Sequence, residues 1–264
     1  MFNRRTVFVV GTFVLVLGGV VGLVLTYPFS YTDRTIPYDG TVPVDETDSY
    51  QIEGELVFEN GLSIEYEGAM DTGGEAYFSG QWDGGEYREK QYSPNNSTVY
   101  SKLRVENESD ADRIDVEDDA EVVERYEDDG TYAVVTKRED IDGTHPVVDE
   151  HRSLNQLLAT VAVRNDYERV GSEASNGVDF HVYEPRATWL GSSNDSYYLS
   201  NASGAAYVHG DTGKLHRVDI SFDVAVVSTY VEYYTNPDEA ETVSIAYEHE
   251  ETDVDIDHPN WASG

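Results

Sequence analysis

Hydrophobic and polar residues alternate along most of the chain after residue 49. This period of two is typical of β-strands that bury one face. It recurs in residues 178–182 and 243–247, and is clearest in residues 218–226. There one face is predicted to hold Val218, Ile220, Phe222, Val224 and Val226, with Arg217, Asp219, Ser221 and Asp223 on the other. The pattern predicts an acidic, β-rich domain over residues 49–264.

Turn residues interrupt the alternation at short intervals, as expected for hairpins between antiparallel strands. Asn60-Gly61 is the strongest of these signals, because this dipeptide favours a two-residue hairpin turn. Three further turns are expected at Asp83-Gly84-Gly85, Asp128-Asp129-Gly130 and Asp211-Thr212-Gly213. Together they predict nine to eleven antiparallel strands, with residues 105–121 as a solvated acidic loop.

One segment, residues 153–164, has a helical period. Leu154, Leu157, Leu158 and Val161 follow the i, i+3, i+4, i+7 spacing that aligns side chains on one helical face. Ser153 and Gln156 have the spacing of a capping box, which places the start of the helix at Ser153. A sheet is needed to cover this apolar face. The predicted fold class is therefore α+β, mainly antiparallel β, with a curved sheet wrapped over one amphipathic helix.

The amino-terminal segment differs from everything that follows. No residue is charged between Thr6 and Leu25, and about 20 apolar residues match the ~30 Å hydrocarbon layer of a membrane. A secretory signal has a shorter apolar region followed by small residues at a cleavage site, whereas Pro28 and Phe29 follow here. We therefore expect residues 6–27 to be a transmembrane anchor rather than a cleaved signal.

Charge sets the expected topology. Arg4 and Arg5 precede the span, so residues 1–5 are expected to be a cytoplasmic tail and the main domain extracellular, on a single-pass anchor in the cell membrane. Residues 28–48 hold three prolines without apolar periodicity and are expected to form a stalk. The arginine pair also resembles a twin-arginine export signal. Gly18 and Gly22 have the G-x-x-x-G spacing of helices that associate in membranes, a spacing that chance also produces in a glycine-rich span.

The chain is strongly acidic, with 52 Asp and Glu against 17 Lys and Arg and a formal net charge of −35. Disorder is one interpretation of such a charge, but 20 Tyr, 8 Phe and 3 Trp argue for a folded core. An acidic, lysine-poor surface is instead typical of halophilic proteins, in which salt screens the repulsion. This charge argues against nucleic acid as a partner, because phosphate contacts need clustered cations. The absence of cysteine excludes disulfides, thiolate metal sites and a lipid-modified cysteine.

Glycosylation would agree with an external domain. Five N-x-[ST] sequons, a motif that also arises by chance, are present at Asn95, Asn96, Asn107, Asn194 and Asn201.

No sequence motif indicates catalysis or a cofactor. The chain lacks G-x-S-x-G, a phosphate-binding loop and the H-E-x-x-H pattern of zinc enzymes. His209 and His216 flank a predicted turn and could approach each other across strands. Asp253, Asp255 and Asp257 would share one face of a strand and form a weak candidate calcium site, with a solvated acidic surface as the alternative. The sequence therefore predicts a non-enzymatic protein without a cofactor.

The order of the segments YERVGSEASNGVDFHVYEP (167–185), AAYVHGDTGKLHRVDISFDV (205–224) and HPNWA (258–262) resembles haloarchaeal envelope lipoproteins of unknown function. Their domain is similar to the bacterial lipoprotein-carrier fold, in which a half-open antiparallel sheet wraps over helices and acyl chains bind between them. The family's lipid-modified cysteine is missing, so the anchor would serve as the tether. The resemblance implies a lipid or other apolar ligand between sheet and helix.

Two functional hypotheses follow. In the first, the domain binds or hands over an apolar ligand, or docks an envelope protein. The ligand would lie in a dry cavity lined by Leu154, Leu157, Leu158, Val161, Val218, Ile220 and Phe222. In the alternative, the domain is a glycosylated structural or interaction module without a small ligand, and a packed core is expected instead.

Overall fold

The computed structural model describes residues 49–262 except 84–86, 96, 113, 115, 117–118, 129, 140, 142–144, 163, 176, 192–195, 228 and 236–239. The predicted cytoplasmic tail, anchor and stalk, residues 1–48, lie outside the described residues. No helix in the described part of the chain is long and apolar enough to cross a membrane.

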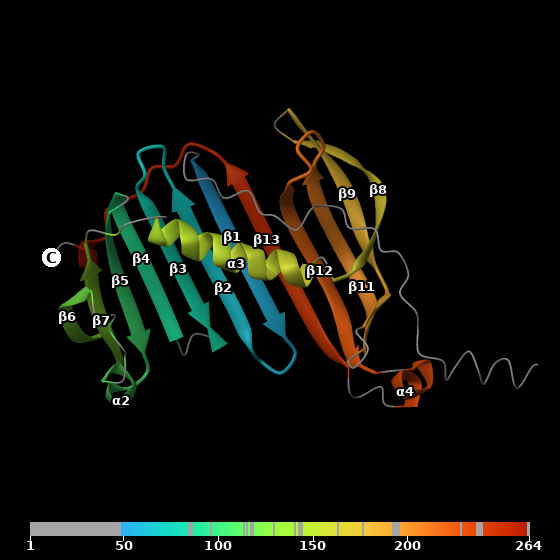
Figure 1. Ribbon diagram of the computed structural model, residues 1–264, viewed down its shortest axis with the longest axis horizontal. Helices are drawn as coiled ribbons and strands as arrows, with labels where there is room; N and C mark the ends of the chain where they lie inside the picture. Colours follow the sequence, from blue (N-terminus) through green and yellow to red (C-terminus); the bar gives the residue numbers. More distant parts are fainter. Residues whose placement is uncertain are drawn as a thin grey trace, which may run out of the picture.

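A single open antiparallel sheet makes up the domain (Figure 1). The antiparallel β prediction is confirmed, although there are thirteen strands rather than nine to eleven. One half contains β1 (Tyr50–Phe58), β2 (Ser63–Met70), β3 (Ala76–Trp82), β4 (Tyr87–Asn95), β5 (Thr98–Val105), β6 (Ala120–Asp128) and β7 (Thr131–Arg138). The other contains β8 (Asp166–Ser175), β9 (Val178–Arg186), β10 (Thr188–Gly191), β11 (Ser196–His209), β12 (Leu215–Val226) and β13 (Glu241–Glu251).

The two halves meet where the first strand pairs with the last. Along the sheet the order is β6-β7-β5-β4-β3-β2-β1-β13-β12-β11-β9-β8, and β10 pairs with β11. The predicted turns at Asn60-Gly61 and Asp211–Gly213 each join two paired strands, as expected. The predicted turns at 83–85 and 128–130 include residues outside the described ranges, but the strands that flank them, β3 with β4 and β6 with β7, are paired. Three short helices lie at the periphery: α2 (Glu108–Ala111), α4 (Tyr230–Thr235) and η3 (Asn260–Ala262). The predicted loop at 105–121 therefore includes α2.

The long helix α3 (Pro146–Ala162) crosses one face of the sheet over β4, β3, β1 and β13 (Figure 1). The predicted start at Ser153 is wrong, because the helix begins two turns earlier and Ser153 is exposed within it. Pro146 suits the first helical position, since its φ is already helical and its missing N–H needs no partner there. The His145 carbonyl accepts the first helical bond, from the Asp149 N–H at 2.9 Å.

The main core lies between α3 and the sheet. The buried side of the helix consists of Val147, Val148, His151, Leu154, Asn155, Leu158, Ala159 and Ala162. Leu154 and Leu158 join a single cluster with Val218, Ile220 and Phe222, as their periodicity predicts. Leu157 is 39% exposed, however, because the buried face runs through Leu154, Asn155, Leu158 and Ala159 and leaves Leu157 at its edge.

The end of β12 corrects the predicted strand face. Val226 is 62% exposed, and Val224 is only half-buried, whereas Ala225 and Val227 are buried. These two residues pack with Trp189 of β10 in a separate cluster on the opposite face. The short β10–β11 pairing thus supplies a second apolar surface, which a period-two pattern in β12 alone does not reveal.

The two strands that end the sheet order, β6 and β8, each carry a β-bulge. Val123 of β6 and Val170 of β8 are each an extra residue in the pairing with the neighbouring strand. Their side chains are 37% and 48% exposed. Bulges disrupt the row of free backbone groups that an edge strand would offer to another strand.

Close packing between α3 and β2 predicts a strong effect at Gly68. A Cβ added there would lie 2.3 Å from Nε2 of His151, within the core. We expect Gly68→Ala to lower the free energy of unfolding by about 2–3 kcal/mol through overpacking. Gly171→Ala is the control, because no atom lies within 4 Å of its added Cβ. Chemical denaturation in molar potassium chloride measures both, and an equal effect of the two substitutions would contradict this packing.

Candidate functional site

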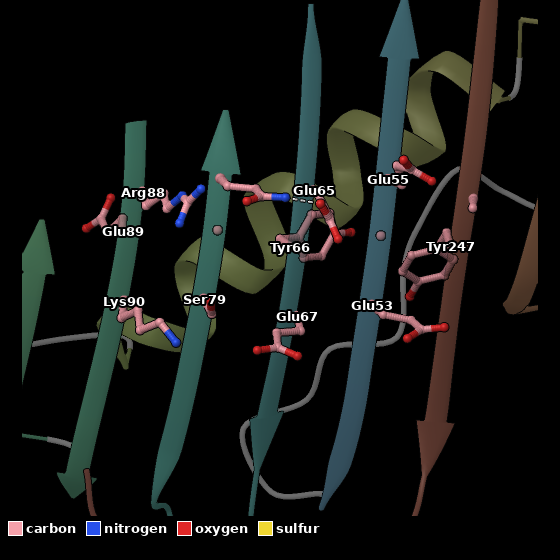
Figure 2. A pocket seen from close by; sticks show the side chains of 14 residues that line it. Glu53, Glu55, Glu65, Tyr66, Glu67, Ser79, Arg88, Glu89, Lys90 and Tyr247 are labelled. Atoms are coloured by element: carbon pink, nitrogen blue, oxygen red, sulfur yellow. Dashed lines mark hydrogen bonds between the residues drawn. The ribbon is translucent and has the colours of Figure 1, made fainter. Parts of the chain in front are cut away.

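The face of the sheet opposite α3, here called the outer face, carries most of the charges on the central strands. Figure 2 shows these side chains in front of β13, β1, β2, β3 and β4, with α3 behind the sheet. Because side chains alternate along a strand, the residues between those that contact α3 point to this face.

Strand register arranges the charges in two rows across the outer face. The first row runs through Glu248, Glu53, Glu67, Ser79, Lys90 and Lys102, from β13 to β5. The second runs through Ala246, Glu55, Glu65, Gln81, Arg88 and Arg104. In both rows acids occupy β1 and β2, cations occupy β4 and β5, and a neutral residue occupies β3.

The outer face therefore has an acidic half (Glu53, Glu55, Glu65, Glu67 and Glu248) and a basic half (Arg88, Lys90, Lys102 and Arg104). Like charges lie directly opposite each other within each half, which is unfavourable for cross-strand pairs. Pairing the same strands with alternating charges would avoid this repulsion. The arrangement thus has a cost within the monomer that an oppositely charged ligand or partner would offset.

Tyrosines support the lysines of the basic half. Nζ of Lys90 lies 5.9 Å from the ring centre of Tyr77, and Nζ of Lys102 lies 5.2 Å from that of Tyr126. These distances are suited to cation–π attraction. The hydroxyl of Tyr77 also accepts from Lys90 at 3.3 Å and donates to Glu67 at 3.4 Å, linking the two halves across β3.

Two hollows of about 520 and 540 Å³ lie on the outer face. The first (Figure 2) is lined by the part of the charged rows on β1–β4, and the carboxylate of Glu65 accepts from Nε2 of Gln81 within it. The second is bounded by residues 254–257 of the carboxy-terminal tail. The volumes fall within the range of ligand sites.

The tail follows β13 and crosses the outer face close to the start of β1. Val254 N–H donates to Oγ of Ser49 at 3.1 Å, and the His258 ring lies 4.9 Å from the ring of Tyr92. Burial first, and then the hydrogen bond to Glu75, raise the pKa of the Tyr92 hydroxyl. The tail thus covers one end of the outer face and borders the first charged row, because Glu53, Glu67 and Glu248 line the same hollow as residues 254–257.

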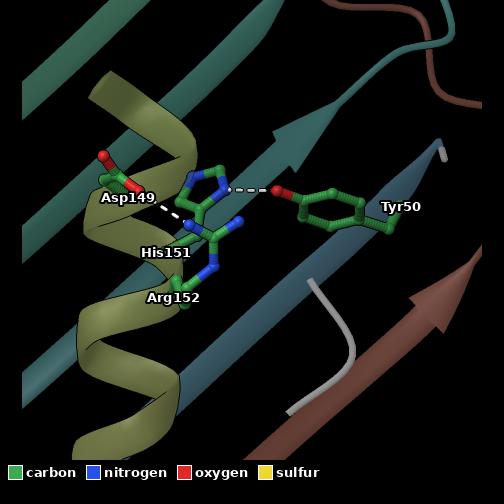
Figure 3. A network of polar contacts seen from close by, with 4 residues as sticks. All are labelled: Tyr50, Asp149, His151 and Arg152. Atoms are coloured by element: carbon green, nitrogen blue, oxygen red, sulfur yellow. Dashed lines mark hydrogen bonds and ion pairs between the residues drawn. The ribbon is translucent and has the colours of Figure 1, made fainter. Parts of the chain in front are cut away.

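A buried histidine joins α3 to the sheet on the other face (Figure 3). Nε2 of His151 donates to the Tyr77 carbonyl at 2.9 Å, so Nδ1 accepts from the Tyr50 hydroxyl, also at 2.9 Å. Both bonds suit a neutral imidazole, and burial lowers the pKa of His151 to about 3. His249, whose ring stacks on Tyr50, is buried too, and its pKa falls to about 4. By contrast, Arg152 points away from the core and pairs with Asp149.

A smaller hollow of about 300 Å³ lies on the helix side, beyond the end of α3 that contacts β4. Its apolar walls are Val99, Leu103, Ile114, Val116 and Val134, and its polar groups include Glu89 and Arg138. Nearby on α3, burial and then the charge of Glu89 raise the pKa of Glu150.

The sequence indicated that His209 and His216 could approach each other across strands. They lie close together, but the ring of Phe180 lies between them. The Phe180 ring stacks on His216 at 4.4 Å and meets His209 edge-on at 5.9 Å. This is an aromatic packing arrangement beside a turn. Phe180, His209 and His216 also line a further hollow of about 390 Å³.

The candidate calcium ligands lie in the tail. Asp253, Asp255 and Asp257 are exposed in a segment without strand pairing. Val254 and Ile256 alternate with them and are half-buried. Within the described ranges, no group of three His, Asp or Glu is arranged to hold a metal ion.

Three of the five sequons lie on described, exposed positions. Asn95 ends β4, Asn107 caps α2 by accepting from the Asp110 N–H, and Asn201 donates to Asp223 at 2.6 Å. Asn96 and Asn194 lie outside the described residues.

The charged rows were not identified from the sequence. The Asn60-Gly61 signal predicts the β1–β2 hairpin, but a two-residue turn there would pair Glu55 with Tyr66. The observed loop has three residues, with the Phe58 N–H donating to the Leu62 carbonyl, and this loop pairs Glu55 with Glu65. The basic half required the registers of β3, β4 and β5 as well. Compared with protein-family models and with curated proteins, the chain matches no family and no relative.

The buried imidazole of His151 predicts a loss of stability in acid. The unfolded state binds a proton below a pKa of about 6.5, while the folded state resists protonation to about 3. The contribution of His151 to stability therefore falls as pH drops between these values, by up to about 1.4 kcal/mol per pH unit. His151→Gln should remove this part of the slope in denaturation measured from pH 7 to 4. Tyr50→Phe, which keeps the imidazole, should retain it; equal slopes in all three proteins would contradict a buried neutral histidine.

Proposed function

We propose that the chain is a membrane-anchored module that docks an envelope protein through the outer face of its sheet, outside the cytoplasm. The observation that carries the proposal is the ordered pair of charged halves on an uncovered sheet face. The proposal includes the anchor at residues 6–27 and the stalk at 28–48.

Packing on the helix side favours docking over a lipid held between sheet and helix. Leu158, Ile220 and Phe222 are each at most 2% exposed and belong to one cluster. A ligand between α3 and these strands would have to displace that core. The outer face needs no such rearrangement.

The position of β1 suits this role. Tyr50 pairs with Glu251, whereas Phe58 pairs with Val243, so the stalk joins one end of the strands and α4 lies towards the other. With the strands roughly perpendicular to the bilayer, the outer face would look sideways, towards a neighbouring protein anchored in the same membrane.

Photo-crosslinking in cells tests the docking face. A benzoylphenylalanine at Gln81, within the charged rows, should give a discrete adduct of the full-length chain. The same probe at Gln156, which is exposed on α3, should not. Adducts from both positions, or from neither, would reject docking through the outer face.

The helix-side hollow favours a second candidate function, binding of a short amphiphile. At about 300 Å³ it reaches the lower limit of ligand pockets, and its apolar walls lie beside Arg138. Decanoate, an apolar chain with one carboxylate, is a suitable probe.

Titration of the full-length protein with decanoate, followed by native mass spectrometry, tests this candidate. Saturable 1:1 binding is expected, and Leu103→Phe, which fills the hollow, should weaken it at least tenfold. Leu62→Phe, at a position 50% exposed in the β1–β2 turn, should leave binding unchanged. Equal binding by both variants would assign the decanoate to another surface.

A further inference from the structure

We propose that the docked partner is a second copy of the chain, stacked outer face to outer face about a two-fold axis along β3. This rests on the proposed function and names its partner. The argument comes from the positions of the charges relative to β3, from the direction of β1 and from the area available.

The two charged rows reverse sign about β3. One strand from β3 on either side, Glu67 and Lys90 occupy equivalent positions in the first row, and Glu65 and Arg88 do so in the second. Two strands away, Glu53 matches Lys102 and Glu55 matches Arg104. Each acid therefore has a cation at the same row and the same distance on the opposite side of Ser79 or Gln81.

The axis would run parallel to β3, in the plane between the two stacked faces. A rotation of 180° about it generates a second copy that faces the first, with its acidic and basic halves exchanged from side to side. It would place each of these four acids over the matching cation of the other copy. Because the interface is isologous, each of the four pairings occurs twice. A two-fold axis perpendicular to the strands would instead set acids against acids.

The same axis suits two chains in one membrane. Rotation about β3 preserves strand direction, so β1 of both copies starts at the same end and both stalks lead towards one bilayer. The perpendicular axis would send the two stalks in opposite directions. Gly18-x-x-x-Gly22 in the predicted anchor has the spacing of helices that pair in parallel.

The available area is adequate for a specific contact. Seven strands, from β13 to β7, span about 29 Å at 4.8 Å spacing, and the tail leaves roughly 20 Å of their length uncovered. Stacking would then bury about 600 Å² per copy, or about 1,200 Å² in total, the lower limit of a standard interface. At 1 M salt the Debye length is about 3 Å, so the long-range repulsion between two copies of charge −35 is screened, and attraction between the halves acts only between charges in direct contact.

A crosslinking experiment exploits the absence of cysteine. Ser79→Cys places a unique thiol on the proposed axis, close to its own counterpart in the partner. In full-length protein in nanodiscs at molar salt, a short bismaleimide should crosslink it into a dimer. Ser153→Cys, exposed on α3, is the control and should remain monomeric.

Charge reversal tests the pairing itself in the Ser79→Cys background. Arg88→Glu with Lys90→Glu makes β4 acidic and leaves Lys102 and Arg104 as the cations of the rows, and Glu65→Lys with Glu67→Lys makes β2 basic. Each variant alone should crosslink at least tenfold less. An equimolar mixture, reconstituted together, should recover crosslinking as a heterodimer, which also shows that both variants are folded.

The outcomes separate this inference from the proposed function. Crosslinking unchanged by either reversal, or not recovered in the mixture, would overturn the two-fold arrangement. A Gln81 adduct with a different protein, without Ser79→Cys dimers, would also overturn it while leaving docking through the outer face intact. Absence of the Gln81 adduct and of dimers would reject both.

Discussion

The rest of the structure depends on the packing of α3 across the seam between β1 and β13. Each half of the sheet alone would expose an apolar face, and the seam joins strands from opposite ends of the domain sequence. The helix covers both sides of this seam, and Tyr50 on β1 meets His151 on α3 there. Because such non-local pairing is entropically costly before it is complete, helix and seam are expected to stabilise each other.

This packing also decides which face can interact with other molecules. Strand alternation sends every second side chain of β1–β5 towards α3, and the remaining side chains form the charged rows. A single register therefore fixes both the core and the outer face, since a one-residue slip would exchange them. The register that forms the core therefore also places Glu53 and Glu67 on one side of β3 and the cations of β4 and β5 on the other side.

Local signals were sufficient for much of the fold. Asn60-Gly61 identifies the position of its hairpin because Gly61 adopts the positive φ of 94° that the turn needs, although the loop has three residues rather than two. Alternation identifies Val243, Ile245 and Tyr247 as core. The capping signal at Ser153 failed because burial of Val147, Val148 and His151 extends the helix to Pro146. The orientation of the end of β12, with Val226 exposed, depends on packing against β10. The basic half of the outer face depends on the four successive strand registers from β1 to β5. These features arise from tertiary contacts that no short segment encodes.

Association through a sheet can use its edges or its faces, and the two are not equivalent here. The bulges at Val123 and Val170 interrupt the free edges of β6 and β8, so extension of the sheet by another strand is opposed at these two edges. On the helix side, the central strands are already covered by α3. The outer face is left as the broad surface with regular geometry, and its charges change sign across β3 rather than being uniformly acidic. In a chain with 52 acids and 17 cations, placing four cations together on that face is a physical argument for recognition rather than for solubility alone.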